Sequence, residues 1–222
     1  MTKLLDRVAD AGGILHVLLV FGGFAFLVAP HLPGALDSPD AVLAHLQANP
    51  PTTAFWAGIW LEGAGLAALV LLAARITSRI RSAQPGWWLP PAALGLAVAA
   101  FTVKVGSFAP ALAALEVERF DAATVTALLS INDAAVGVTG ALDGAFVLLL
   151  GLGSTAVRAL PRWLSALTVV TGLAVLVANA VPALGLLHLL LYIWLLVVSG
   201  WLLARGARVP VAPARGSATV ST

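Results

Sequence analysis

Residues 53–74 read TAFWAGIWLEGAGLAALVLLAA, and Glu62 is the only charged residue among them. Residues 125–153 read VTALLSINDAAVGVTGALDGAFVLLLGLG, with Asp133 and Asp143 as their charged residues. A helix of about 20 apolar residues crosses the ~30 Å hydrocarbon core of a bilayer. Both stretches therefore predict transmembrane helices, and both place a carboxyl group where hydrocarbon disfavours it.

Four more apolar stretches are of the same kind: residues 11–29, 87–108, 163–181 and 184–204. The whole chain is 60% hydrophobic and 10% charged, far from the balance of a soluble domain. We therefore predict an all-α polytopic membrane protein in which residues 1–207 form one domain of six transmembrane helices. Ser38-Pro39 predicts the start of a short outer helix, and the Pro-, Gly- and Ser-containing residues 208–222 predict a disordered cytoplasmic tail.

The basic residues gather at one end of the predicted bundle. Ten of the twelve fall before the first helix or after the second, fourth and sixth, whereas the opposite loops carry mainly acids. Cytoplasmic loops retain Lys and Arg, so both termini are expected in the cytoplasm and the chain in the plasma membrane. The cations are spread over helix ends and indicate contacts with lipid phosphates rather than with nucleic acid. The chain has no cysteine, which excludes disulfides and thiol chemistry.

Glu62 and Asp143 have matching surroundings, Leu61-Glu62-Gly63-Ala64 and Leu142-Asp143-Gly144-Ala145. Their similar distances from the arginines that follow each helix predict a similar depth in the bilayer. If the two carboxyls meet, one remains protonated beside the other's carboxylate and can donate a proton. Glycines follow Glu62 at 63 and 65 and bracket Asp143 at 140 and 144, which favours close helix packing. The match also suggests that the helical hairpin of residues 53–108 and the one of residues 125–181 are parallel copies of one unit.

Other polar residues predict a cavity around these acids: Lys104, Asn132, Asp133, Asn179 and His188. Lys104 has three readings, an ion pair with Glu62, an ion pair with Asp133, or extension to the outer headgroups. His16 is expected to lie apart, in the inner part of the first helix. No histidine pair has ligand spacing, so neither a metal nor a cofactor is expected.

Aromatic rings can stabilise a cation that forms near the acids. Six are candidates for the cavity lining, and ordinary helix packing is the alternative for each: Phe55, Trp60, Phe101, Phe146, Tyr192 and Trp194. Trp87, Trp88, Trp163 and Trp201 are instead placed as expected for residues at the membrane interface.

Two resemblances add to these expectations. The stretches Ala159-Leu160-Pro161-Arg162-Trp163-Leu164 and Trp201-Leu202-Leu203-Ala204-Arg205 resemble a broad set of small six-helix membrane proteins of high-GC bacteria, whose function is unknown. Glu62 and Asp143, by type and setting, are similar to the intramembrane acids of membrane-integral isoprenoid and terpene cyclases. This second resemblance implies acid-catalysed cyclisation or isomerisation of an isoprenoid with Glu62 and Asp143 as the catalytic pair.

Two other classes of function remain open on the sequence. A proton-coupled transporter would use the same acids as a relay, and with six helices it would be expected to work as a homodimer. In a structural or accessory subunit, the carboxyls would only hydrogen-bond neighbouring helices. The expected partners are therefore the lipid bilayer and a lipophilic small molecule.

Overall fold

The computed structural model describes residues 2–34 and 38–206, so the tail expected from residue 208 lies outside the described residues. Within them, six helical segments are long and apolar enough to cross a membrane. They are Gly12–His31, Thr53–Ala83, Leu89–Ala113, Ala122–Val157, Arg162–Ala180 and Ala183–Arg205. The prediction of a multi-pass, all-helical chain is confirmed to this extent.

These segments are built from shorter elements. The first contains α2 (Gly12–Val20), a π-helical stretch η1 (Phe21–Val28) and a 3-10 turn η2 (Ala29–His31). The third joins α5 (Leu89–Gly106) to α6 (Phe108–Ala113), and the sixth joins η3 (Pro182–His188) to α9 (Leu189–Gly206). The remaining helices are α1 (Thr2–Asp10), α3 (Pro39–Ala48), α4 (Thr53–Ala83), α7 (Ala122–Val157) and α8 (Arg162–Ala180).

The two longest helices extend beyond the apolar stretches that predict them. Thr52 Oγ1 accepts a hydrogen bond from Phe55 N at the start of α4, and Asp121 Oδ1 accepts one from Thr124 N at the start of α7. These side chains satisfy amide groups that a helix start leaves unpaired, so α7 begins before its hydrophobic part. Its 36 residues span about 54 Å.

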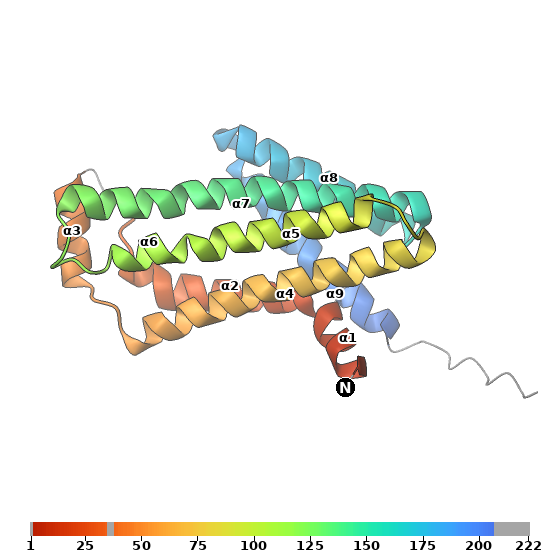
Figure 1. The fold of residues 1–222 in the computed structure, drawn as a ribbon, viewed down its shortest axis with the longest axis horizontal. Helices are drawn as coiled ribbons and strands as arrows, with labels where there is room; N and C mark the ends of the chain where they lie inside the picture. The colour runs from red at the N-terminus through yellow and green to blue at the C-terminus, as the bar shows by residue number, and fades with distance from the viewer. Residues whose placement is uncertain (1, 35–37, 207–222) are drawn as a thin grey trace, which may run out of the picture.

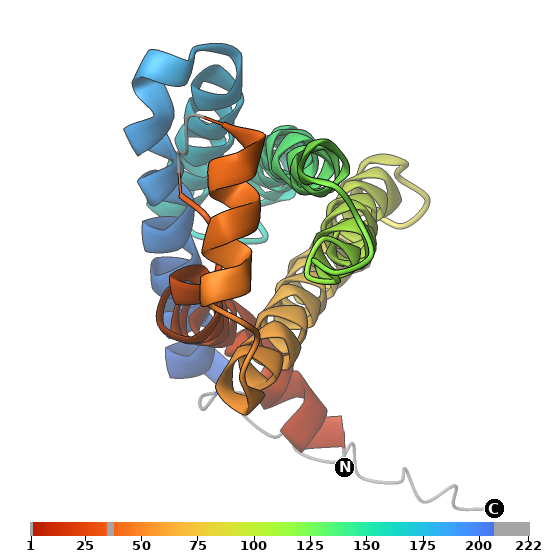
Figure 2. The same ribbon diagram turned by 90° about the vertical axis from the view of Figure 1, so that its left-hand side faces the viewer.

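The long helices set the shape of the molecule. In Figure 1, α4, α5 and α7 run side by side along the long axis, and the end-on view of Figure 2 shows α8 and α9 on the other side of the bundle. The short helix α3 lies across one end. Its start is as predicted, because Ser38 Oγ accepts a hydrogen bond from Ala41 N. Val42 and Leu46 of α3 are buried against Ala114 and Val125, so α3 packs onto the bundle.

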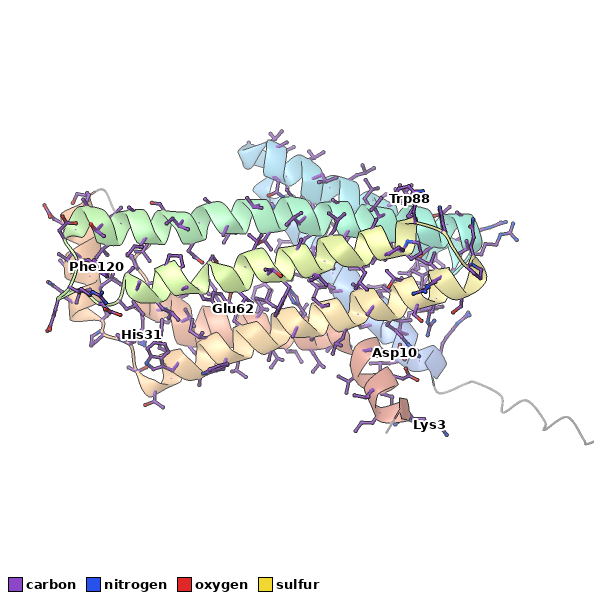
Figure 3. The ribbon with its side chains drawn as sticks, viewed as in Figure 1. Lys3, Asp10, His31, Glu62, Trp88 and Phe120 are labelled. Carbon is purple, nitrogen blue, oxygen red and sulfur yellow. The ribbon has the colours of Figure 1, made fainter. Side chains whose placement is uncertain are left out.

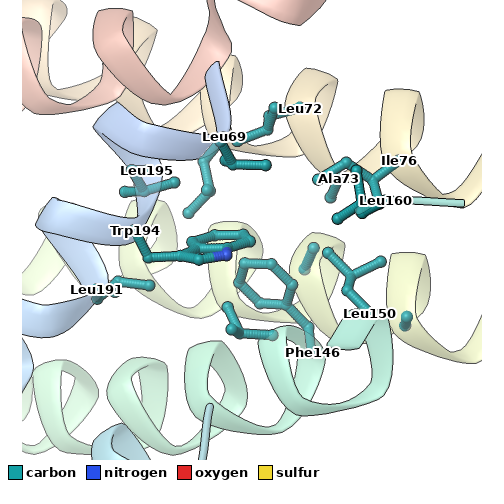
Figure 4. Packing of buried hydrophobic residues seen from close by; sticks show 14 of the residues in the cluster. Leu69, Leu72, Ala73, Ile76, Phe146, Leu150, Leu160, Leu191, Trp194 and Leu195 are labelled. Atoms are coloured by element: carbon teal, nitrogen blue, oxygen red, sulfur yellow. The ribbon is translucent and has the colours of Figure 1, made fainter. Parts of the chain in front are cut away.

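The core between α4, α7 and α9 is apolar. Trp194 and Phe146 are fully buried and face each other there, with leucines of α4, α7 and α9 around them (Figure 4). The indole Nε1 of Trp194 donates to Thr168 Oγ1 at 2.8 Å, so the polar atom of this ring is satisfied. These contacts fix the relative positions of the helices that carry the polar residues described below.

The opposite end of the bundle carries most of the arginines. Arg75 Nε lies 2.8 Å from Asp10 Oδ1, and Arg75 Nη1 lies 3.0 Å from Asp6 Oδ1. The i, i+4 spacing of the two aspartates puts both on one face of α1, and these contacts tie α1 to α4. We call this the arginine-rich end, and the end covered by α3 the α3 end.

Candidate functional site

Glu62 faces the interior of the bundle from α4. Its exposed fraction is 4%, and Figure 3 shows it within the bundle, between the α3 end marked by His31 and the arginine-rich end marked by Asp10. The close approach of η1 encloses it. A Cβ added to Gly23 would lie 2.7 Å from Gly58 O and 3.1 Å from Glu62 N, so only glycine lets η1 pass this close to α4. Gly65 makes a similar approach to Val20, whereas Gly63, expected to do the same, faces open space.

Lys104 of α5 is the partner of Glu62. Its Nζ lies 3.6 Å from Glu62 Oε1, and both side chains are largely buried. Lys104 Nζ also donates to Asn132 Oδ1 at 3.4 Å, and Ser107 Oγ donates to the same oxygen at 2.9 Å. Of the three readings of Lys104, the ion pair with Glu62 is therefore the correct one. Asn132 supports it as expected.

Asp143 projects from α7 where that helix packs against α8. A Cβ on Gly140 would lie 2.7 Å from Asn179 Oδ1, and one on Gly144 would lie 2.9 Å from Leu176 Cγ, so the two glycines admit α8 as predicted. Asp143 as a whole is only partly buried, but its Oδ1 is enclosed and has no hydrogen-bond partner among the described residues. An enclosed, unpartnered oxygen makes the charged form of this carboxyl costly.

The two acids line one cavity of about 300 Å³. Its other polar side chains come from six helical elements, and its apolar side chains are Val20, Leu66, Val136 and Leu191. The polar set is His16, Lys104, Thr139, Asn179, His188 and Tyr192. The expectation that Glu62 and Asp143 belong to one site thus agrees with the geometry. The site differs from the expected acid pair because Glu62 is held by a cation.

A second, smaller cavity of about 30 Å³ lies on the other side of the Glu62–Lys104 pair. Both residues line both cavities. The smaller one is otherwise bounded mainly by residues near the α3 end, among them Leu32, Phe55 and Leu112. The ion pair therefore stands between a water-sized space toward the α3 end and the larger cavity that contains Asp143.

His16 was expected to lie apart from this group, and that expectation is wrong. Its Nδ1 lies 3.0 Å from Gly65 O, and its ring stacks on Tyr192 with 6.4 Å between centroids. Because a carbonyl can only accept, His16 Nδ1 carries a proton and donates this hydrogen bond. The error arose because position along the first helix was taken as distance from the site, whereas α2 lies against α4 next to Gly65.

Asn179 and His188 both line the cavity, as expected, and they also contact each other. Asn179 Nδ2 lies 3.1 Å from His188 Nε2, and His188 Nδ1 lies 3.0 Å from Gly185 O. The carbonyl again fixes the tautomer, so Nδ1 donates and Nε2 accepts from the amide. The pair joins the end of α8 to the 3-10 segment η3.

The expected aromatic lining is only partly present. Tyr192 lines the larger cavity and Phe55 the smaller one, but Trp60 is 80% exposed and Phe101 lines neither. Phe146 and Trp194 are buried in the apolar core. The position of Trp60 around α4 explains its exposure: it lies two residues from Glu62, which is about 200° around the same helix. Asp133 is also exposed and lines neither cavity, so it does not support the site.

Thr139 is a cavity residue that the sequence analysis missed. Its Oγ1 is buried without a hydrogen-bond partner among the described residues. It lies four residues before Asp143, a spacing that puts both on one helix face and that was visible in the sequence.

Comparison of the chain with protein-family models, curated proteins and solved structures gave no match.

The arrangement brings together an acid that forms no ion pair among the described residues, the Glu62–Lys104 pair and hydrogen-bonding groups in a partly apolar cavity. Asp143 can give a proton to a bound molecule, and Glu62 presents a negative oxygen whose charge Lys104 balances. His16, His188 and Tyr192 can hydrogen-bond polar parts of the same molecule.

Proposed function

We propose that this cavity is the site of acid-catalysed isomerisation of a lipophilic, isoprenoid-type molecule that enters from the bilayer. The observation that carries the proposal is the shared cavity. In it Asp143, whose Oδ1 has no hydrogen-bond partner among the described residues, faces the same space as the Glu62–Lys104 pair. Asp143 gives its proton to one carbon of a double bond. Protonation leaves a cation on the other carbon of that bond. The Asp143 carboxylate then takes a proton from the next carbon along, on the far side of the cationic carbon, so that the double bond shifts by one position and the acid is regenerated.

The cavity favours isomerisation over cyclisation. A cyclising carbocation moves along the substrate and is stabilised by a wall of aromatic rings. Of the six aromatic candidates, only Tyr192 lines the larger cavity. A single protonation next to the fixed negative oxygen of Glu62 requires no such wall, because the positive charge develops in one place.

Deuterium incorporation tests this proposal directly. The purified protein is incubated in ²H₂O with farnesol or geranylgeraniol, and carbon-bound deuterium is measured by mass spectrometry. We expect incorporation by the wild type and by Asp133→Asn, the matched control on the same helix. Asp143→Asn should slow it by about 10²-fold or more, the usual contribution of a general acid. No incorporation by the wild type into either alcohol would refute the isoprenoid proposal.

Proton-coupled transport is the second candidate, supported by the Glu62–Lys104 pair lining both cavities. Protonation of Glu62 would release Lys104 and change the barrier between the two spaces. A homodimer would be the working unit. Proteoliposomes that contain a pH-sensitive dye test this candidate: substrate-dependent acidification, abolished by Glu62→Gln, supports transport, whereas deuterated product without proton flux supports the enzyme.

For either activity we propose the plasma membrane as the location, with both termini and the arginine-rich end in the cytoplasm. The support is the distribution of charge, because arginines of α4, the α7–α8 turn and α9 share one end while Asp40, Glu116, Glu118 and Asp121 lie near the other. The smaller cavity would then lie toward the outside.

A further inference from the structure

A second polar region lies at the arginine-rich end, far along α7 from the cavity described above. A groove of about 590 Å³ runs between the last turn of α7 and the first turns of α8. An adjoining hollow of about 290 Å³ shares Arg158, Leu160 and Arg162 with it and extends to Trp201 and Arg205 of α9. In Figure 1 the α7–α8 turn lies at the right-hand end of the bundle.

The groove is strongly cationic. Arg158, Arg162 and Arg205 line the two hollows, and no carboxylate lines either one in the part of the chain that the structure describes. None of the three takes part in an ion pair within residues 2–34 and 38–206, unlike Arg75 and Arg79, which contact Asp10. The guanidinium groups therefore remain available to an anion, and their planar forks suit the oxygens of a phosphate.

The groove is also lined by a buried hydroxyl group and lies beside a helix start that has no side-chain cap. Ser154 lines the groove with an exposed fraction of 0%, and its hydroxyl has no hydrogen-bond partner among the described residues. The start of α8 is also without a side-chain cap, because Pro161 occupies the N-cap position. An enclosed hydroxyl without a partner and an uncapped helix start both favour an acceptor-rich, negatively charged occupant.

The other end of the groove is apolar. Along α8 it continues over Ala166, Val169 and Val170, about 12 Å from Arg162 at 1.5 Å per residue. Val170 is 56% exposed, on a segment long and apolar enough to span a membrane. A free phosphate ion would use only the arginines, whereas a phospholipid would use the arginines with its headgroup and the valines with its acyl chains. The groove therefore fits a lipid better than a free ion.

We propose that this groove binds one anionic phospholipid, with its phosphate held by Arg158 and Arg162 and an acyl chain lying over Val169 and Val170. Arg205 adds positive potential from α9, and the Ser154 hydroxyl donates to the headgroup. Basic pockets between transmembrane helices at a membrane surface are suited to such headgroups. The proposal does not depend on the chemistry of the Asp143 cavity.

Native mass spectrometry of the full-length protein in detergent tests the proposal. The protein is titrated with dioleoylphosphatidylglycerol, dioleoylphosphatidylcholine or inorganic phosphate. We expect one phosphatidylglycerol molecule to bind tightly and phosphatidylcholine to bind at least tenfold more weakly. Millimolar phosphate should not displace the bound phosphatidylglycerol. Equal affinity for the two lipids would overturn the anionic specificity. Displacement by inorganic phosphate would overturn the assignment to a lipid.

Two sets of variants locate the site. Arg158→Gln with Arg162→Gln should weaken phosphatidylglycerol binding at least tenfold, whereas the control pair Arg7→Gln with Arg81→Gln should leave it within twofold. The control removes the same charge from the same end, but neither residue lines the groove. Ser154→Ala should weaken binding about threefold or more without lowering the melting temperature of the lipid-free protein. Equal losses in the two arginine pairs would refute the site.

Discussion

At the scale of single residues, Lys104 changes what Glu62 presents to the cavity. The two charged groups are 3.6 Å apart and largely buried. Burying two charges costs several kcal/mol per ion, and their attraction offsets much of this only while both are present. The pair is therefore not a strong net source of stability, although each charge depends on the other.

A double-mutant cycle measures this dependence. Lys104→Met leaves Glu62 buried and unpaired, so we expect it to lower the free energy of unfolding by about 3–5 kcal/mol in detergent–SDS titrations. Adding Glu62→Gln to Lys104→Met should restore a large part of that loss, because no lone charge remains. Asp133→Asn, at an exposed carboxyl outside the site, should change stability by less than about 0.5 kcal/mol. Additive effects of the two site variants would show that Glu62 and Lys104 are not coupled.

Asp121 provides a pH-dependent effect outside the membrane. Hydrogen bonds from Thr124, through its side chain and then its backbone amide, lower the pKa of the Asp121 carboxyl below its usual value of 3.8. A lowered pKa stabilises the folded helix start above pH 3.8, and the effect is lost as the pH falls through the folded value. We expect the protection factor of the Thr124 amide, which is corrected for the intrinsic pH dependence of exchange, to fall only below about pH 4. Asp121→Asn should remove this dependence, since Asn caps without titrating.

At the scale of elements, the crossing of η1 and α4 depends on two glycines that face each other. A Cβ added to Gly58 would lie 2.8 Å from Gly23 O, just as a Cβ added to Gly23 would lie close to Gly58 O. A π-helical stretch widens the helix, and such stretches occur often at functional sites. Here it lies directly against the turn that carries Glu62, so the packing of η1 sets how far Glu62 is enclosed.

Gly23→Ala and its neighbour Gly22→Ala separate packing from helix propensity. A Cβ at position 23 would meet backbone atoms, so we expect a loss of about 1–3 kcal/mol in the free energy of unfolding. At position 22 no atom lies within 4 Å of the added Cβ, and alanine should stabilise the helix by up to about 1 kcal/mol. If both substitutions had the same effect, the close crossing would not contribute to stability.

The sequence predicts where these helices lie along the chain better than it predicts which side of each helix faces the cavity. Long apolar runs identify every spanning segment, and Ser38 marks the start of α3, because both signals are local along the chain. Trp60 was placed in the site and His16 outside it, since helix rotation and the neighbours of each helix depend on contacts between distant residues. Thr139 was within reach of a sequence argument, because it stands one turn from Asp143 on the same helix.

At the scale of the whole molecule, the length of α7 indicates how deep in the bilayer the cavity lies. If the hydrocarbon core begins near Val157, its ~30 Å covers about twenty residues of α7, back to roughly residue 138. Thr139 and Asp143 then lie inside the core, whereas Asp133 lies beyond it, in agreement with its exposure. The first part of α7 and the α3 helix packed on it would stand outside the hydrocarbon. The cavity then occupies the half of the membrane nearer the α3 end.

The orientation of the molecule in the membrane can be measured by cysteine labelling, because the chain has no cysteine of its own that would react. Single cysteines are introduced at Ser82, in the last turn of α4, and at Glu118, before α7; both positions are exposed and lie at opposite ends of the bundle. With both termini cytoplasmic, a membrane-impermeant maleimide added to intact cells should label the Glu118→Cys variant and not the Ser82→Cys variant. After the cells are permeabilised, both should react. The reverse pattern in intact cells would place the arginine-rich end outside, against the retention of basic loops in the cytoplasm. It would also turn the smaller cavity beside Glu62 toward the cytoplasm.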